Sequence, residues 1–222
     1  MDKTRTGSAP ARRPEPQAGT AARFIPPGAD LPALRRAAAE CTACPLHAVG
    51  TRTVFGAGPP DAELMLVGEQ PGDQEDQAGE PFVGPAGRLL DRALEQAGID
   101  RSRTYVTNAV KHFKWEPRGK RRIHSKPNAG EIRACKPWLE AEIALIAPKA
   151  IVCLGATAAQ ALLGRDFRVS RDRGMFLQSD LAVHVMATVH PSSLLRVPDE
   201  ASRRASIARF VDELRKVSQV LD

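Results

Sequence analysis

The chain has 222 residues, enough for one domain of ordinary size with a single sizeable core. Hydrophobic residues make up 42% and aromatic residues only 5%, so aliphatic side chains and alanine must build that core. The formal net charge of +6 suits a phosphate-rich partner, although many proteins are mildly basic. No apolar run approaches the ~18 residues of a membrane span, which argues against a membrane protein.

The first stretch, residues 1–28, is rich in Pro, Ala, Arg and Gly and has no apolar periodicity. This composition predicts a disordered basic arm, followed by a folded domain over 29–222. The arm also lacks the apolar centre of a secretory signal. We therefore expect a cytoplasmic protein whose four cysteines are thiolates or metal ligands rather than disulfides.

Four short apolar runs predict buried parallel strands at 63–68, 104–110, 149–155 and 181–189. Helical patterns alternate with them at 86–98, 129–147, 156–164 and 200–221. Gly98 is the expected C-terminal cap of the first helix. Together they predict a single three-layer α/β domain with a central, mostly parallel four-stranded sheet flanked by helices. Because ligands of such sheets bind beyond the carboxyl ends of the strands, the polar stretches found there are the expected site.

Residues 68–91, GEQPGDQEDQAGEPFVGPAGRLLD, are the most informative of these stretches. One interpretation is a glycine-rich loop whose backbone N–H groups cradle a phosphate at the start of a helix. The stretch lacks the Lys-Ser/Thr ending of a P-loop and the G-x-G-x-x-G spacing, however, and its carboxylates would repel nucleotide phosphates. Nucleotide binding is therefore disfavoured.

The cysteines are candidate metal ligands. Cys41 and Cys44 form a C-x-x-C pair, a common metal half-site, while Cys135 and Cys153 are too far apart to be recognised as a pair from sequence. A structural zinc and plain core thiols both remain open at this point. Cys153, in an apolar strand, could simply pack.

Residues 119–127, GKRRIHSKP, put His124 in a strongly basic loop. Basic loops commonly bind phosphates without sequence preference, and the histidine would then be a bystander. The ring takes part in chemistry only if it reaches the sugar of a bound nucleic acid. In that case the neighbouring cations would disfavour its protonation and keep a lone pair available at neutral pH. Arg122 would hold the loop closed over the site.

Three motifs in chain order, GEQPGDQED…GEPFVGPAG, TNAVKH and HPSSLLR, together with the four cysteines, resemble the iron–sulfur (family four) uracil-DNA glycosylases. The resemblance covers about residues 35–220. The insertion KRRIHSKP is similar to the branch called UdgX, which becomes covalently joined to uracil-containing DNA, whereas the ordinary branch hydrolyses the base away and turns over. The resemblance implies the uracil-DNA glycosylase fold and a structural 4Fe–4S cluster held by Cys41, Cys44, Cys135 and Cys153.

The same resemblance implies a pocket for a base flipped out of the helix. Phe82 would stack on the pyrimidine, and Gln70 would give its backbone N–H to the base. Asn108 would accept from uracil N3–H and donate to O4, a pattern that cytosine reverses. Without the resemblance, Phe82 would more often be a loop side chain that plugs the core, and Asn108 a turn residue.

Other positions would assist. Leu194, Leu195 and Arg196 resemble the wedge that fills the gap left by the flipped nucleotide, and which leucine enters the DNA is open. A loop anchored in the core is the alternative for these three residues. Asp73 and Asp76 would order the acidic loop, or are simply solvated acids.

Three residues would carry the chemistry. Glu69 would stabilise the oxocarbenium-like state at C1′, and His190 would donate to uracil O2, where negative charge builds as the base leaves. His124 would attack C1′ in place of water and remain bonded to it. One event per protein molecule is then expected.

We therefore predict an enzyme of DNA repair that excises uracil from single- or double-stranded DNA and is captured on C1′ through His124. It would act as a monomer. The nearest alternative is a turnover glycosylase that releases free uracil and an abasic site. A non-catalytic DNA-binding or zinc-stabilised module is a third, and the combination of Glu69, Phe82, Asn108 and His190 argues against it.

Overall fold

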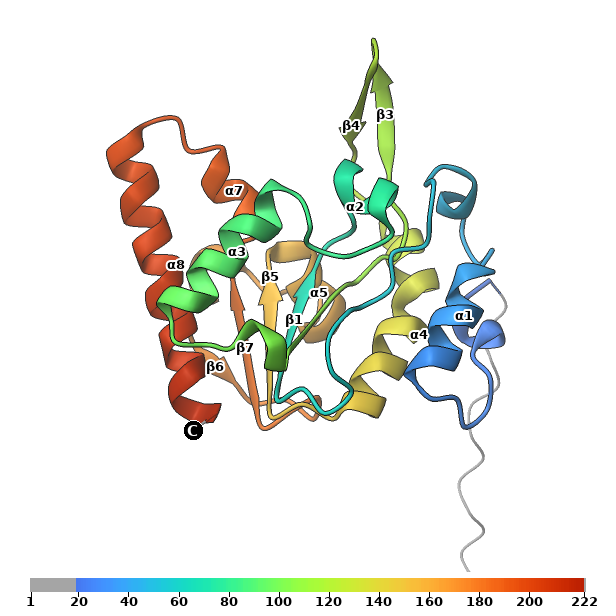
Figure 1. The fold of residues 1–222 in the computed structure, drawn as a ribbon, viewed down its shortest axis with the longest axis horizontal. Coiled ribbons are helices and arrows are strands. Elements are labelled where there is room, and N and C mark those ends of the chain that lie inside the picture. The colour runs from blue at the N-terminus through green and yellow to red at the C-terminus, as the bar shows by residue number, and fades with distance from the viewer. Residues whose placement is uncertain (1–18, 222) are drawn as a thin grey trace, which may run out of the picture.

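Five strands form the sheet at the centre of residues 19–221, the part of the chain that the computed structural model describes (Figure 1). Their order is β2-β1-β5-β7-β6. Four are parallel, as predicted: β1 (Leu64–Gly68), β2 (Thr104–Asn108), β5 (Ala150–Leu154) and β7 (His184–Thr188). The fifth, β6 (Phe176–Leu177), pairs antiparallel with β7 at the edge. It was not predicted, because a strand of two residues has no periodicity to read.

Successive side chains of each strand point to opposite faces, and helices cover both faces. On one face Leu66 and Val106 pack against α3 (Pro85–Gln96) and α8 (Glu200–Leu221). On the other, Met65 and Ile151 pack against α4 (Ala129–Ile146) and α5 (Ala156–Leu163). A third apolar cluster surrounds Trp138 of α4 and includes residues of α1 (Leu31–Ala39). The predicted three-layer α/β architecture is confirmed.

All four predicted helices are present, with ends within two residues of the expected ones. Gly98 follows the end of α3 with φ 74°, the left-handed conformation expected after a helix. The shorter elements are η1 (Ala21–Phe24), η2 (Pro45–Ala48), α2 (Asp73–Ala78), η3 (Arg101–Arg103), α6 (Val169–Asp172) and α7 (Pro191–Leu195). Among the described residues, no helix combines the length and the apolar character needed to cross a membrane.

A two-stranded hairpin replaces part of the predicted basic loop. Strand β3 (Trp115–Arg118) pairs antiparallel with β4 (Arg121–His124), and Trp115 lies opposite His124. Gly119 in the connecting turn has φ 59°, which glycine adopts without strain and which allows so tight a reversal. Figure 1 shows the hairpin projecting past the carboxyl ends of β1 and β5. The prediction of a loop over all of 119–127 is therefore wrong, and His124 ends a strand.

The predicted N-terminal arm also needs a correction. Residues 1–18 lie outside the described residues. From residue 19 onward the chain is folded: η1 packs on α4, and Ala21 is fully buried in the apolar cluster around Trp138. The boundary predicted at residue 28 therefore lies too far along the chain, because a short 3₁₀ turn with one buried alanine carries no visible apolar period.

Candidate active site

The predicted site residues lie along one edge of the sheet. Gly68, the last residue of β1, is in register with Asn108, the last of β2, so Glu69 leaves the sheet beside Asn108. His190 follows β7, which is two strands from β1. Gly155, directly after β5, faces His190: a Cβ added to this glycine would lie 3.0 Å from the histidine Cβ. Parallel strands thus bring residues from distant parts of the sequence to one place.

Gly68, Phe82 and Asn108 meet at this edge. A Cβ on Gly68 would lie 2.3 Å from Asn108 Oδ1 and 2.8 Å from Phe82 Cζ, so only glycine leaves room there. Phe82 has φ 58°, a strained conformation for a bulky residue that costs about 1–3 kcal/mol. Its ring stacks at 6.1 Å and 27° from the ring of His190. Strain of this kind gathers at binding sites, and an aromatic face beside an amide suits a planar base.

Two polar groups at this edge have no partner within the described chain. Asn108 is only 3% exposed, yet no described residue hydrogen-bonds to its side-chain amide. Its backbone carbonyl, by contrast, accepts from Lys111 Nζ at 2.7 Å. The backbone N–H of Gln70 likewise finds no acceptor among residues 19–221. Both groups are therefore available to a bound ligand.

Glu69 is the carboxylate of the site. Its Oε1 lies 3.2 Å from His124 Nε2, and its Oε2 accepts a short hydrogen bond from Thr157 Oγ1. Burial acts to raise the pKa of Glu69, but the hydrogen bonds from His124 and Thr157 and the nearby His190 outweigh it, so the pKa lies below its ordinary value. At neutral pH the site therefore holds a negative charge.

His190 is the N-terminal cap of α7, and this fixes its tautomer. The backbone N–H of Ser192 donates to His190 Nδ1 at 3.2 Å, so Nδ1 carries no proton and Nε2 does. Burial lowers the pKa of His190 to about 4, although Glu69 acts to raise it. The ring is neutral at pH 7 and offers Nε2–H as a donor.

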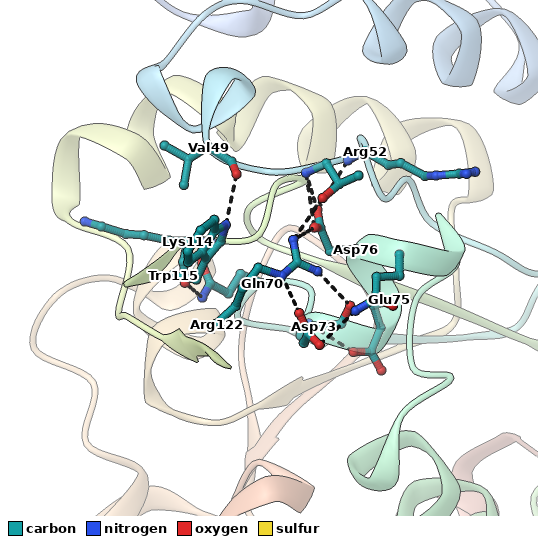
Figure 2. A network of polar contacts seen from close by, with 12 residues as sticks. Val49, Arg52, Gln70, Asp73, Glu75, Asp76, Lys114, Trp115 and Arg122 are labelled. Atoms are coloured by element: carbon teal, nitrogen blue, oxygen red, sulfur yellow. Dashed lines mark hydrogen bonds and ion pairs between the residues drawn. The ribbon is translucent and has the colours of Figure 1, made fainter. Parts of the chain in front are cut away.

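Arg122 of β4 fastens the hairpin to α2 (Figure 2). Its Nε donates to Asp73 Oδ1 at 2.5 Å, and its Nη1 donates to Asp76 Oδ2 at 2.6 Å and to Thr51 Oγ1 at 2.9 Å. Its guanidinium also lies over the rings of Phe113 and Trp115. Asp76 is fully buried and accepts a further bond from the Thr51 N–H at 2.8 Å. Arg122 thus joins the hairpin that carries His124 to the acidic segment.

The base of the hairpin is held separately. The side-chain amide of Gln70 donates to the carbonyls of Lys114 and Ser125 at 3.2 and 3.1 Å and accepts from the Lys114 N–H at 3.1 Å (Figure 2). Trp115 Nε1 donates to the Val49 carbonyl at 2.9 Å. Gln70 therefore grips both ends of the hairpin with its side chain, while its backbone N–H stays free of described partners.

The two leucines of the HPSSLLR motif point to different environments. Leu194 is 3% exposed and packs in the core with α3 and α8, whereas Leu195 is 42% exposed. Arg196 is exposed, and its guanidinium lies 3.4 Å from Ser192 Oγ. A buried side chain cannot enter DNA without leaving the core. Leu195 and Arg196 are therefore the accessible members of the predicted wedge.

Comparison with known proteins identifies the family of this chain. Residues 55–215 match the family model described as the uracil DNA glycosylase superfamily. The chain belongs to the uracil-DNA glycosylase superfamily. It is 38% identical over 176 residues to the type-4 uracil-DNA glycosylase of Pyrobaculum aerophilum, covering 76% of this chain and 86% of that protein. It is 40% identical over 166 residues to the type-4 enzyme of Thermotoga maritima, covering 74% of this chain and 83% of that one.

The four cysteines of this superfamily member lie in two different apolar clusters. Cys41, Cys44 and Cys135 share the apolar cluster around Trp138, and Cys135 Sγ accepts from the Lys111 N–H at 3.2 Å. Cys153 belongs to the neighbouring cluster, in the middle of the sheet. Burial alone raises the pKa of Cys153 to about 12. The pKa of Cys135 is raised by burial and also by the nearby Cys44 and Cys41.

The fit to a metal group is therefore partial. Within residues 19–221, no three His, Cys, Asp or Glu side chains are close enough to hold a single metal ion. Leu139, one helical turn after Cys135, shares a cluster with Cys153, whereas Cys135 itself lies in the cluster around Trp138. Cys41, Cys44 and Cys135 share one apolar cluster but do not form a metal site as they are placed, and Cys153 lies in another cluster.

Sequence reasoning missed two supporting groups of this candidate site. Thr157 is the second residue of α5 and bonds to Glu69. A signal for it existed, because it follows the third predicted strand at the expected edge. The Thr51 N–H donates to Asp76 Oδ1 and its hydroxyl oxygen accepts from Arg122 Nη1, and Thr51 lies in a stretch with no motif. No pattern in the sequence pointed to Thr51.

Proposed function

We propose that this protein excises uracil from DNA as a repair enzyme and then remains bonded to deoxyribose C1′ through His124. The observation that carries the proposal is the 3.2 Å contact between His124 Nε2 and Glu69 Oε1. A nucleophile beside an ionised carboxylate is the arrangement needed to attack a cationic carbon. Two separate anchors, Arg122 and the Gln70 side chain, hold the histidine there.

Base recognition follows from the unpaired groups. The Asn108 amide accepts from uracil N3–H and donates to O4, and cytosine would leave both of its groups unpaired. The Gln70 N–H and the His190 Nε2–H supply donors for uracil oxygens. Phe82 supplies an aromatic face for the flipped base, close to the His190 ring.

The chemistry begins with cleavage of the C1′–N1 bond, whose electron pair leaves with uracil. His190 Nε2–H stabilises the charge that builds on O2, and the Glu69 carboxylate stabilises the oxocarbenium-like sugar. His124 Nε2 then bonds to C1′, and its proton passes to Glu69 as that bond forms. The proton passes to the departing base, so neutral uracil leaves. Overall, imidazole replaces uracil on the sugar and one proton moves from the ring to the base.

DNA binding would use exposed groups on both sides of this edge. Leu195 is the wedge residue that can enter the gap left by the flipped nucleotide, with Arg196 beside it. At the hairpin tip Arg118, Lys120 and Arg121 are all exposed and can neutralise phosphates. The substrate we propose is uracil-containing DNA, single- or double-stranded. A monomeric state and a cytoplasmic location remain predictions.

We also propose a structural 4Fe–4S cluster, as the sequence resemblance implies. Cys41, Cys44 and Cys135 would hold it, and their shared cluster with an N–H donor to Cys135 supports this. Cys153 remains the predicted fourth ligand, although its present position does not complete the set. When bound, the cluster would tie the segment after α1 to α4. It takes no part in the chemistry at C1′.

Turnover remains the second candidate function. The His124 side chain is 50% exposed, so water can approach from the same side. If water reaches C1′ first, the product is free uracil and an abasic site. The competition between imidazole and water thus decides between capture and turnover.

A denaturing gel tests this competition directly. Purified protein is incubated with a uracil oligonucleotide and a thymine control, and free uracil is quantified in parallel. We expect one shifted band per protein molecule with uracil alone, and mass spectrometry should locate the linkage on His124. His124→Ala should lose the band and release free uracil through attack by water. His184→Ala, which changes a histidine near Phe176 at the opposite end of the sheet, should keep the band. A band that survives in His124→Ala would refute the proposal.

A further inference from the structure

The turn between β5 and α5 contacts both Glu69 and His190. Gly155 faces His190, as described above, and Thr157 donates its hydroxyl to Glu69 Oε2. Thr157 is 3% exposed and sits in the first turn of α5, so the scaffold fixes its position.

The two oxygens of Glu69 have different kinds of partner. Oε1 faces His124, which is carried by a hairpin that projects from the body of the protein (Figure 1). Oε2 faces a hydroxyl on a buried helix. Among residues 19–221, no other hydrogen bond reaches this carboxylate. When His124 turns to the sugar, the contact with Thr157 is the one that keeps the carboxylate in place.

We propose that Thr157 is a positioning residue: its hydroxyl fixes Glu69 Oε2 so that Oε1 faces C1′ and the carboxylate stays ionised as the sugar becomes cationic. This inference rests on the proposed uracil excision but not on covalent capture. It predicts that Thr157 acts on bond cleavage, and that His124 is not needed for its effect.

The direction of the pH effect follows from the groups around Glu69. The titratable groups facing it are His124 from β4 and His190 from the segment before α7, and the pKa of Glu69 lies below its ordinary value. Removing the Thr157 hydroxyl takes away a hydrogen bond to the charged form, which raises that pKa. A reaction that needs the ionised carboxylate then fails at a higher pH than in the wild type.

Three variants separate this role from packing. Thr157→Val keeps the shape and loses the hydroxyl, while Thr157→Ser keeps the hydroxyl. Thr104→Val removes an equally buried hydroxyl that bonds to the Asp100 carbonyl at the opposite end of the sheet. Single-turnover uracil release, measured from pH 5 to pH 9 with ~100 nM oligonucleotide, should slow at least about tenfold at pH 7 in Thr157→Val, with the acidic limb moved upward. Thr157→Ser and Thr104→Val should keep the wild-type profile.

The same series in a His124→Ala background sharpens the test. There Thr157 is the last described donor to Glu69, so Thr157→Val should slow uracil release by a larger factor than it does with His124 present. A wild-type pH profile for Thr157→Val, or a uniform loss at all pH values that Thr157→Ser shares, would overturn the inference. Absence of any adduct in the wild type would instead defeat covalent capture, and the profile of uracil release would still decide the role of Thr157.

Discussion

Arg122→Ala should reduce covalent capture far more than uracil excision. Arg122 carries the contacts of β4 with Asp73, Asp76 and Thr51, and its loss leaves His124 on a hairpin fastened mainly at its base. Glu69 and the base pocket depend on the sheet and keep their places. The protein should therefore shift from capture toward release of free uracil.

The magnitude can be worked from the burial of the partners. The Asp76 side chain is fully buried and that of Arg122 is 20% exposed, whereas that of Asp73 is 45% exposed. Breaking a buried pair costs about 3–5 kcal/mol, and an exposed pair contributes about 0–1 kcal/mol. Partial exposure of Arg122, and the N–H groups that still bond to Asp76, reduce the first figure to about 2 kcal/mol. That corresponds to about a thirtyfold smaller equilibrium constant for the attached over the detached hairpin.

The assay measures the ratio of adduct to free uracil in one reaction, with equal protein and uracil oligonucleotide. Arg121→Ala is the matched control, because it removes a neighbouring exposed cation of the same strand. We expect the ratio to fall by up to about thirtyfold in Arg122→Ala and to stay near the wild-type value in Arg121→Ala. If both variants lost capture equally, phosphate binding rather than attachment of the hairpin would explain the role of Arg122.

Further changes test other parts of the site. Asn108→Asp should slow uracil release at least about tenfold, because a carboxylate repels O4 where the amide donated; parallel assays with uracil and cytosine oligonucleotides measure this. Leu195→Ala should reduce capture of duplex DNA more than of single-stranded DNA, which a gel with both substrates shows. Leu194→Ala should instead lower the free energy of unfolding by about 2–5 kcal/mol, measured by denaturant titration. Cys135→Ser should lose iron, as seen in metal analysis and the visible absorption of the purified protein.

The sheet and its ligand edge could be predicted because buried parallel strands have a clear sequence pattern. Runs such as ELMLVG and KAIVCLG are apolar on both faces, and each is followed by a polar turn. Because the carboxyl ends of parallel strands lie together, the sequence alone predicts that Glu69, Asn108 and His190 lie near one another. The fold and the position of the site both follow from this pattern of apolar runs, each followed by a polar turn.

The rest depends on contacts that periodicity cannot show. The hairpin has charged side chains on both faces, so no alternation marks β3 or β4. Gln70 was expected to act through its backbone, and only the structure reveals that its side chain holds Lys114 and Ser125. Cys153 has the residue type of a ligand, but its strand position turns the thiol into the apolar layer under α5. Tertiary packing decides each of these cases.

The contacts also divide the protein into two parts with separate tasks. Glu69, Asn108 and His190 are held by the sheet, by Thr157 and by the cap of α7, and the hairpin adds to these supports only the contact of His124 with Glu69 Oε1. The hairpin adds the nucleophile and is attached by side chains that play no part in reading the base. Excision should therefore survive changes that remove capture, whereas capture cannot survive loss of Glu69, because the cation that His124 attacks would not form. The division predicts that variants can lose capture and keep uracil excision, but that no variant loses excision and keeps capture. A variant of the second kind would contradict it.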